Sequence, residues 1–173
     1  MKHQAALILS LPLLLTGCAG GPPPGPLYSD VQQSFPPIAD AKARVIFFRE
    51  HAYGGSAMPI DITLSGKPVG TNYDRSAFYS DVVPGHREFA FKSANLSLFS
   101  GTIPLDIEAG HTYYVQLYVP GGPGAILGAL GGKPIEDGMG KTHCGSDACA
   151  QEVSAGAAQS VLGTLTFNSQ SAT

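Results

Sequence analysis

The sequence predicts an all-β protein, a single antiparallel β-sandwich of about seven strands, preceded by a signal peptide and a proline-rich tether. Short apolar runs recur at regular spacing with turn residues between them, which is typical of sandwiches. No ten-residue amphipathic helix lies between these runs, and parallel βαβ units need such helical crossovers. The 22 glycines and 14 prolines also favour turns and strands over long helices.

The first 17 residues have the pattern of an export signal. Lys2 and His3 precede an apolar run over 5–15, which has the length of a secretory core and is shorter than the roughly 20 residues of a membrane span. The alternatives are an ordinary signal peptide with a chance cysteine and an uncleaved membrane helix. Pro12 argues against the helix.

The run Leu15-Thr16-Gly17-Cys18 resembles the bacterial lipobox. The resemblance implies cleavage between Gly17 and Cys18 and, in a Gram-negative host, three acyl chains on Cys18, and two or more chains anchor a protein stably. Ala19, in place of Asp, favours sorting to the outer membrane. We therefore expect a protein anchored in the lipid bilayer through acylated Cys18 and facing the periplasm.

The composition bounds the remaining chain. Ten basic and 13 acidic residues give a formal net charge of −3. This mild negative charge without a basic cluster argues against nucleic acid or an anionic lipid surface as partner. The expected organisation is a signal peptide (1–17), a lipidated cysteine with a Pro/Gly-rich linker (18–41), and a sandwich domain (42–169). The prolines of the linker favour an extended spacer that holds the domain tens of Å from the membrane.

The strands are predicted from alternation and from the turns that separate them. Phe89 and Phe91 share one face of their strand, Pro84-Gly85 fits a type II turn, and Pro104 favours an edge strand. The candidates are 43–49, 60–64, 68–71, 78–83, 86–91, 103–107 and 112–119, with a last strand over 161–167 that completes the sandwich.

A Gly-rich insert at about 120–159 is too long for an ordinary hairpin. It carries a short apolar run at 125–130 that favours a marginal helix, and it carries the two remaining cysteines. Cys144 and Cys149 are predicted to form a disulfide in the oxidising periplasm, worth about 2 kcal/mol for so small a ring. The alternative is a metal site with His143 and Asp147, which the oxidising compartment disfavours. We expect no metal and no cofactor.

The order of RVIFFRE, ITLSGKPVG, FYSDVVPGHREFAF and IEAGHTYYVQLYV resembles a bacterial lipoprotein family known as domain of unknown function 2846. The shared pieces are Gly66-Lys67-x-Val69-Gly70, Pro84-Gly85-His86 and Gly110-x-Thr112-Tyr113-Tyr114, within 44–119. The resemblance implies an immunoglobulin-like or transthyretin-like sandwich. It implies no activity and no catalytic residues.

No catalytic set is evident in the sequence. Ser56 and Ser80 could be imagined beside a histidine and an aspartate, but neither lies in a G-x-S-x-G nucleophile elbow. Tyr114, Gln116 and Tyr118 share a strand face and are a candidate sugar- or peptide-binding face, against the alternative of ordinary sheet packing. We therefore expect a non-enzymatic binding or assembly module of the envelope, with an envelope protein or a cell-wall glycan as partner. The alternatives are an envelope hydrolase and an accessory subunit of a secretion or transport complex.

Overall fold

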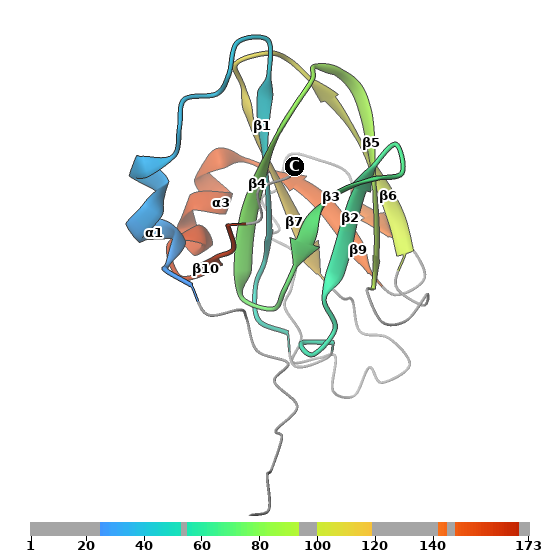
Figure 1. Ribbon diagram of the computed structural model, residues 1–173. Helices are drawn as coiled ribbons and strands as arrows, with labels where there is room; N and C mark the ends of the chain where they lie inside the picture. Colours follow the sequence, from blue (N-terminus) through green and yellow to red (C-terminus); the bar gives the residue numbers. More distant parts are fainter. Residues whose placement is uncertain (1–24, 53–54, 94–99, 119–141, 145–147, 170–173) are drawn as a thin grey trace, which may run out of the picture.

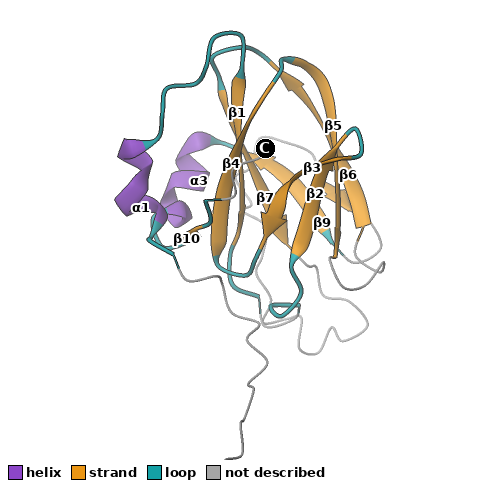
Figure 2. Ribbon diagram, viewed as in Figure 1, coloured by secondary structure: helices purple, strands orange, loops and turns teal. Residues whose placement is uncertain are grey.

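The computed structural model describes residues 25–52, 55–93, 100–118, 142–144 and 148–169. Two β-sheets pack face to face, and the helices lie on the outer side of the larger sheet (Figures 1 and 2). The larger sheet has the order β10-β4-β1-β7-β9-β8 and the smaller sheet the order β3-β2-β5-β6. The predicted all-β sandwich is thereby confirmed. The elements are α1 (Tyr28–Val31), η1 (Gln32–Ser34), β1 (Ala43–Arg49), β2 (Ile60–Leu64), β3 (Lys67–Asn72), β4 (Ser76–Val82), β5 (Gly85–Ser93), β6 (Ser100–Ile107), β7 (Thr112–Tyr118), β8 (Thr142–Cys144), β9 (Cys149–Val153), α3 (Ala155–Leu162) and β10 (Thr166–Phe167).

The main core fills the space between the sheets. Alternate residues of each strand point inward, as the sequence pattern predicts. At its centre the Phe47 ring stacks on Phe78 at 5.3 Å and meets Phe89 edge-on at 5.2 Å, and all three side chains are fully buried. The other large members are Val45, Ile60, Ile62, Phe91, Ile103, Leu105, Ile107, Val115 and Leu117.

Two turns contain residues with positive φ. Ser65 and Gly66 both have positive φ, 52° and 77°, and they close the β2–β3 hairpin between Leu64 and Lys67, as a type I′ turn requires. Gly85 has φ 115°, consistent with its predicted place after Pro84. The strand that contains Pro104, β6, lies at the edge of the smaller sheet, where a missing N–H is tolerated.

The larger sheet is mixed, which the alternation in single strands did not reveal. β1 pairs antiparallel with β4 but parallel with β7, and β10 pairs parallel with β4. Parallel neighbours need a long crossover. Here the connection from β1 to β7 consists of β2–β6, which include β4 of the larger sheet and all four strands of the smaller sheet. The crossover is therefore built of strands, and no helix is needed for it.

The predicted strand over 161–167 is wrong for most of its length. Helix α3 continues through Leu162, and only Thr166 and Phe167 are paired, with β4. Ser154 begins α3, because its side chain accepts a hydrogen bond from the backbone N–H of Ala157 at 3.2 Å. The alanine-rich sequence of α3 favours helix, and its buried side packs on the outer face of the larger sheet.

The linker is not an extended spacer over its described part, 25–40. It forms α1 and η1, which pack on the outer face of the larger sheet near α3 and β10 (Figure 1). Tyr28 is 3% exposed, its backbone N–H donates to Leu165 O at 2.8 Å, and burial raises its pKa to about 12. Phe35 lies 4.8 Å from the Tyr79 ring and 4.9 Å from Phe167. We call residues 25–40 the docked segment.

Arg44 on β1 contacts the docked segment through the Phe35 ring. Its guanidinium donates two hydrogen bonds to the Asp81 carboxylate, at 2.7 and 2.8 Å, and lies 4.0 Å above the Tyr79 ring and 5.9 Å from Phe35. The hydrogen bonds to Asp81 raise the pKa of Arg44 against the opposing effect of burial. The ion pair with Asp81 and the contact with Tyr79 lie within the sheet, and the cation–π contact with Phe35 joins the linker to it.

Part of the predicted insert belongs to the sandwich. β8 and β9 extend the larger sheet beyond β7, and α3 follows them. These strands are three and five residues long, so their alternation is too short to recognise in a Gly-rich context. The predicted signal peptide, Gly17, Cys18 and the run at 125–130 lie outside the described residues. Within the described part of the chain, no helix is long and apolar enough to cross a membrane.

Candidate functional site

A cleft opens where β9 separates from β7. It has a volume of about 320 Å³ and is lined by His111, Thr112, Tyr113, Tyr114, Glu152, Val153, Ser154 and Ala155. One wall is therefore the start of β7 and the other is the end of β9 with the beginning of α3. We call it the β7–β9 cleft.

The cleft exists because the ladder between the two strands stops early. The last pair is Tyr114 with Val153, and the chain then turns into α3 at Ser154. On the other side of β7, the Arg44 N–H donates to His111 O at 3.0 Å. Successive backbone groups of a strand point to opposite sides, so His111 and Tyr113 face β1 while Thr112 faces the side that β9 has left. The N–H and C=O of Thr112 are therefore directed into the cleft.

Glu152 supplies the acidic group of the cleft. It lies opposite Val115, whose side chain is in the main core, so the Glu152 side chain points toward the smaller sheet at the rim of the sandwich. Partial burial, and to a lesser extent the negative charge of Asp106, raises the pKa of Glu152. Among the described residues that line the cleft there is no lysine or arginine.

The aromatic and imidazole groups are held by hydrogen bonds. The Tyr113 hydroxyl accepts from the Glu108 backbone N–H at 2.9 Å, and the Tyr114 hydroxyl accepts from Gln159 Nε2 at 3.5 Å. His111 Nδ1 lies 3.1 Å from the carbonyl oxygen of Ala109, so Nδ1 carries the proton. Two tyrosines, one histidine and one glutamate thus line the cleft together with Thr112.

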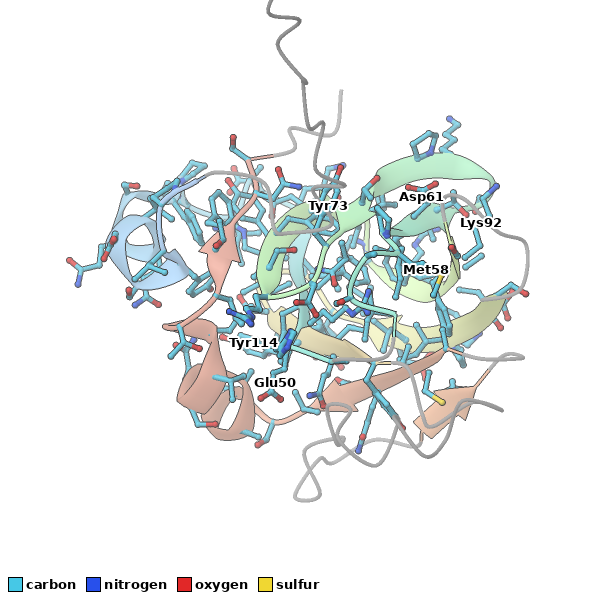
Figure 3. All side chains as sticks on the ribbon, turned by 90° about the horizontal axis from the view of Figure 1, so that it is seen from below. Glu50, Met58, Asp61, Tyr73, Lys92 and Tyr114 are labelled. Atoms are coloured by element: carbon cyan, nitrogen blue, oxygen red, sulfur yellow. The ribbon has the colours of Figure 1, made fainter. Side chains whose placement is uncertain are left out.

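The structure separates the three residues of the predicted ligand face. They share the outer face of β7, but Gln116 is 1% and Tyr118 is 7% exposed, and only Tyr114 lines the cleft. Gln116 Nε2 donates to Glu50 Oε1 at 2.8 Å, and Figure 3 shows Glu50 and Tyr114 on the side of the sheet where α3 lies. The three side chains therefore form no open platform, and their role in binding a ligand stays a prediction.

Three further polar residues, the half-buried Glu50 and the buried Gln116 and Gln151, lie on or next to neighbouring strands of the larger sheet. Burial raises the pKa of Glu50, while the hydrogen bond from Gln116 opposes the shift. Gln151 lies opposite Gln116, and its Oε1 atom has no hydrogen-bond partner within the described part of the chain.

Two other histidines meet carboxylates. His51 Nδ1 lies 2.7 Å from Asp74 Oδ2, and the other carboxylate oxygen accepts from the Ala52 N–H at 3.0 Å, so Asp74 fixes the chain after β1. His86 Nδ1 lies 2.8 Å from Asp106 Oδ1 on the exposed surface. Over the described ranges, no group of three or more His, Cys, Asp or Glu side chains is arranged to hold a metal ion.

The two cysteines lie on neighbouring strands. The register of β8 and β9 places Cys144 opposite Cys149, which is 0% exposed. The backbone thus brings together the two cysteines that the sequence predicts to pair.

Most of the cleft was not found by sequence reasoning. The sequence indicates Tyr114 as a candidate but not Glu152 or Ser154, because these two meet His111 and Thr112 only through the pairing of β7 with β9, about 40 residues apart. The serine before an alanine-rich run is the one local signal that marks this position, as the start of a helix.

Comparisons with family models, curated proteins and solved structures give no match. The fold defines the class of the protein as an all-β sandwich, with a cleft at one end of its larger sheet. The resemblance to domain of unknown function 2846 stays a prediction.

Proposed function

We propose that the chain is a lipoprotein of the outer membrane, facing the periplasm, and that its sandwich is a non-enzymatic binding or assembly module of the envelope. The lipobox-like run ending in Cys18 supports the anchor. The observation that carries the binding role is the β7–β9 cleft of about 320 Å³, whose lining residues include Glu152, two tyrosines and Thr112.

The proposed disulfide between Cys144 and Cys149 fits this role. The register places the two residues opposite each other on β8 and β9. β8 continues the sheet beyond β9, and the end of β9 forms one wall of the cleft. A covalent link there fixes β9 to the edge of the sheet and supports the position of Glu152.

The experiment is site-specific photo-crosslinking in intact cells. A photoreactive amino acid at Thr112 lies in the cleft, and one at Lys67 lies in the exposed β2–β3 hairpin as the matched control. We expect a discrete envelope adduct from position 112 and none from position 67. Equal adducts from both positions, or none from position 112, would refute the binding role.

The anchor and the alternative functions need separate measurements. Mass spectrometry of the mature N-terminus should find acylated Cys18, and Cys18→Ala should release the protein from membranes. Altered muropeptides in the deletion strain, restored by purified protein, would favour the envelope hydrolase. An adduct at position 112 with one subunit of a membrane complex would favour the accessory-subunit role.

A further inference from the structure

We propose that one end of the sandwich rests on the phospholipid surface beside the anchor, through Leu27 and through Tyr73 and Arg75 of the β3–β4 turn. We call these three residues the basal patch. In this contact Arg75 binds a lipid phosphate and Leu27 leaves water. The inference rests on the proposed function, because it needs acylated Cys18 to hold the domain at the bilayer.

The basal patch lies where the described part of the chain begins. β10 joins its two parts, because Leu27 forms a bridge with Thr166, and the Thr166 N–H donates to Arg75 O at 2.9 Å. Neighbouring strands lie about 4.8 Å apart, so the backbones of Leu27 and Arg75 are about 10 Å apart. At this end of the sandwich β1 ends and β4 begins, which is the lower end in Figure 1.

The patch exposes side chains of the kinds that suit a membrane interface. Leu27 is 43% exposed, and it is one of two exposed large hydrophobic residues in the described part of the chain. The Arg75 side chain is 56% exposed, and Tyr73 is half-buried. Tyrosine and arginine place an apolar body in the interface while the polar tip stays at the headgroups. An exposed leucine gains free energy when it leaves water for the acyl boundary.

The charge of Arg75 is available to a phosphate group. Its closest carboxylate is Asp74, 3.8 Å from Arg75 Nε, but Asp74 is buried and already accepts from the Ala52 N–H and contacts His51. Within the described part of the chain, the Arg75 guanidinium makes no hydrogen bond. A planar guanidinium binds phosphate through two parallel hydrogen bonds, so a lipid phosphate fits these donors.

The backbone of Arg75 is an independent reason to expect a contact outside the fold. Its φ is 53°, in the left-handed region that favours glycine. An arginine at this turn is therefore less favourable for folding than a glycine. Residues held in such conformations cluster at binding sites, where the side chain has a use that the fold alone does not explain.

The short attachment favours the contact. Six residues separate Cys18 from Gly25, so Gly25 stays within about 25 Å of the acylated residue. A tether of this length gives an effective concentration of about millimolar, and a contact too weak for a free protein is then populated. Because the whole chain carries a formal net charge of −3, we expect a zwitterionic surface in preference to an anionic one.

The test measures which end of the domain faces the lipid. The mature lipidated protein is reconstituted in vesicles of phosphatidylethanolamine and phosphatidylcholine, part of the latter spin-labelled at the headgroup. A fluorophore is attached to one introduced cysteine, either Ala57→Cys in the loop between β1 and β2 or Ala109→Cys in the turn between β6 and β7. Both alanines are exposed, and they lie at opposite ends of the sandwich, about 20 Å apart. We expect strong quenching at position 57 and weak quenching at position 109.

Two patch variants and one control make the test specific. Leu27→Ser and Arg75→Gly should each lower the ratio of docked to undocked protein, read from quenching at position 57, about fivefold, as for one lost hydrogen bond or its equivalent. Arg75→Gly relieves the positive φ, so its unfolding midpoint should be unchanged or higher, which separates a lost contact from a damaged fold. Lys67→Gln removes an exposed cation at the opposite end and should leave the quenching unchanged.

The outcomes separate this inference from the proposed function. Equal quenching at both positions, or quenching at position 57 that neither patch variant reduces, would overturn the inference. If the acylated protein floats with the vesicles but neither label is quenched, the proposed anchor stands and only the inference is overturned. If mass spectrometry finds no acyl group on the mature chain, the proposed anchor itself fails and the inference fails with it.

Discussion

Gly70 on β3 is the position where one added methyl group should perturb the core most clearly. A Cβ atom at this residue would lie 2.5 Å from Cε2 and 2.8 Å from Cζ of the Phe78 ring. Carbon atoms pack at about 3.5–4.0 Å, so Gly70→Ala creates an overlap of about 1 Å. The backbone of Gly70 does not have positive φ, so the substitution tests packing alone.

The Phe78 ring has little room to move. It is fully buried and stacked on Phe47, which in turn meets Phe89. Overpacking of a dense core costs about 1–3 kcal/mol. For Gly70→Ala we expect a loss of about 2 kcal/mol, which lowers Tm by about 4–8 °C in a domain of this size.

The assay is chemical unfolding of the purified mature protein, followed by circular dichroism. Gly156→Ala is the matched control, because no heavy atom lies within 4 Å of the added Cβ and the residue is in α3. That variant should be stabilised by up to about 1 kcal/mol, since alanine favours helix over glycine. Gly70→Ala with an unchanged unfolding midpoint would refute the packing argument.

A double-mutant cycle makes the test specific. Phe78→Leu creates space at the point of overlap, so Gly70→Ala should cost less in that background than in the natural chain. We expect a coupling free energy of at least about 0.5 kcal/mol, as for other residues in direct contact. Strict additivity would show that the two residues do not share the strain.

Three further predictions concern the cleft, the linker and the cysteines. The pKa of Glu152 is raised in the folded state, so the protonated carboxyl group favours folding. This contribution to the free energy of unfolding is complete below the unfolded pKa and is lost as pH rises through the folded pKa. Glu152→Gln should therefore stabilise the protein against urea more at pH 7 than at about pH 4, and an equal effect at both pH values would contradict the assignment. Phe35→Ala removes the ring contacts that hold the docked segment and should lower the free energy of unfolding by about 1–3 kcal/mol. Trypsin should then cleave faster after Lys42. Unchanged cleavage would argue against docking. The denatured protein from the periplasm should show no free thiol, and two titratable thiols would rule out the bridge between Cys144 and Cys149.

The strands of the sandwich were predictable because their signals are local. Alternation placed Phe89 and Phe91 on one face, Gly85 marked a turn that has positive φ, and Pro104 marked an edge strand. Each of these signals lies within a few residues of the feature it predicts. The parallel pairing of β1 with β7 has no such signal, because it depends on the order of strands across the whole domain.

The docked segment and the cleft could not be predicted for the same reason. Phe35 is held by Tyr79 and Phe167, which lie far along the chain, so the local proline content suggested an open spacer. Glu152 lines the cleft only because β9 separates from β7 just after this residue. Tyr114 was found because it is a large aromatic residue in an evident strand, but its neighbours on the same face proved to be buried.

Because residues 25–40 are docked on the sheet, only a short length of chain lies between them and the proposed anchor. With Cys18 as the proposed attachment point, six residues separate it from Gly25, and the intervening chain can reach at most about 25 Å. Gly25 lies against Phe167, whose strand pairs with the beginning of β4 at Ser76. Ser76 is paired with Arg49 at one end of β1. Thr112 is paired with Arg44 near the opposite end of the same strand. With the acylation of Cys18 that we propose, the end of the sandwich near Ser76 would lie toward the lipid, and the cleft at Thr112 would lie at the opposite end, away from the bilayer.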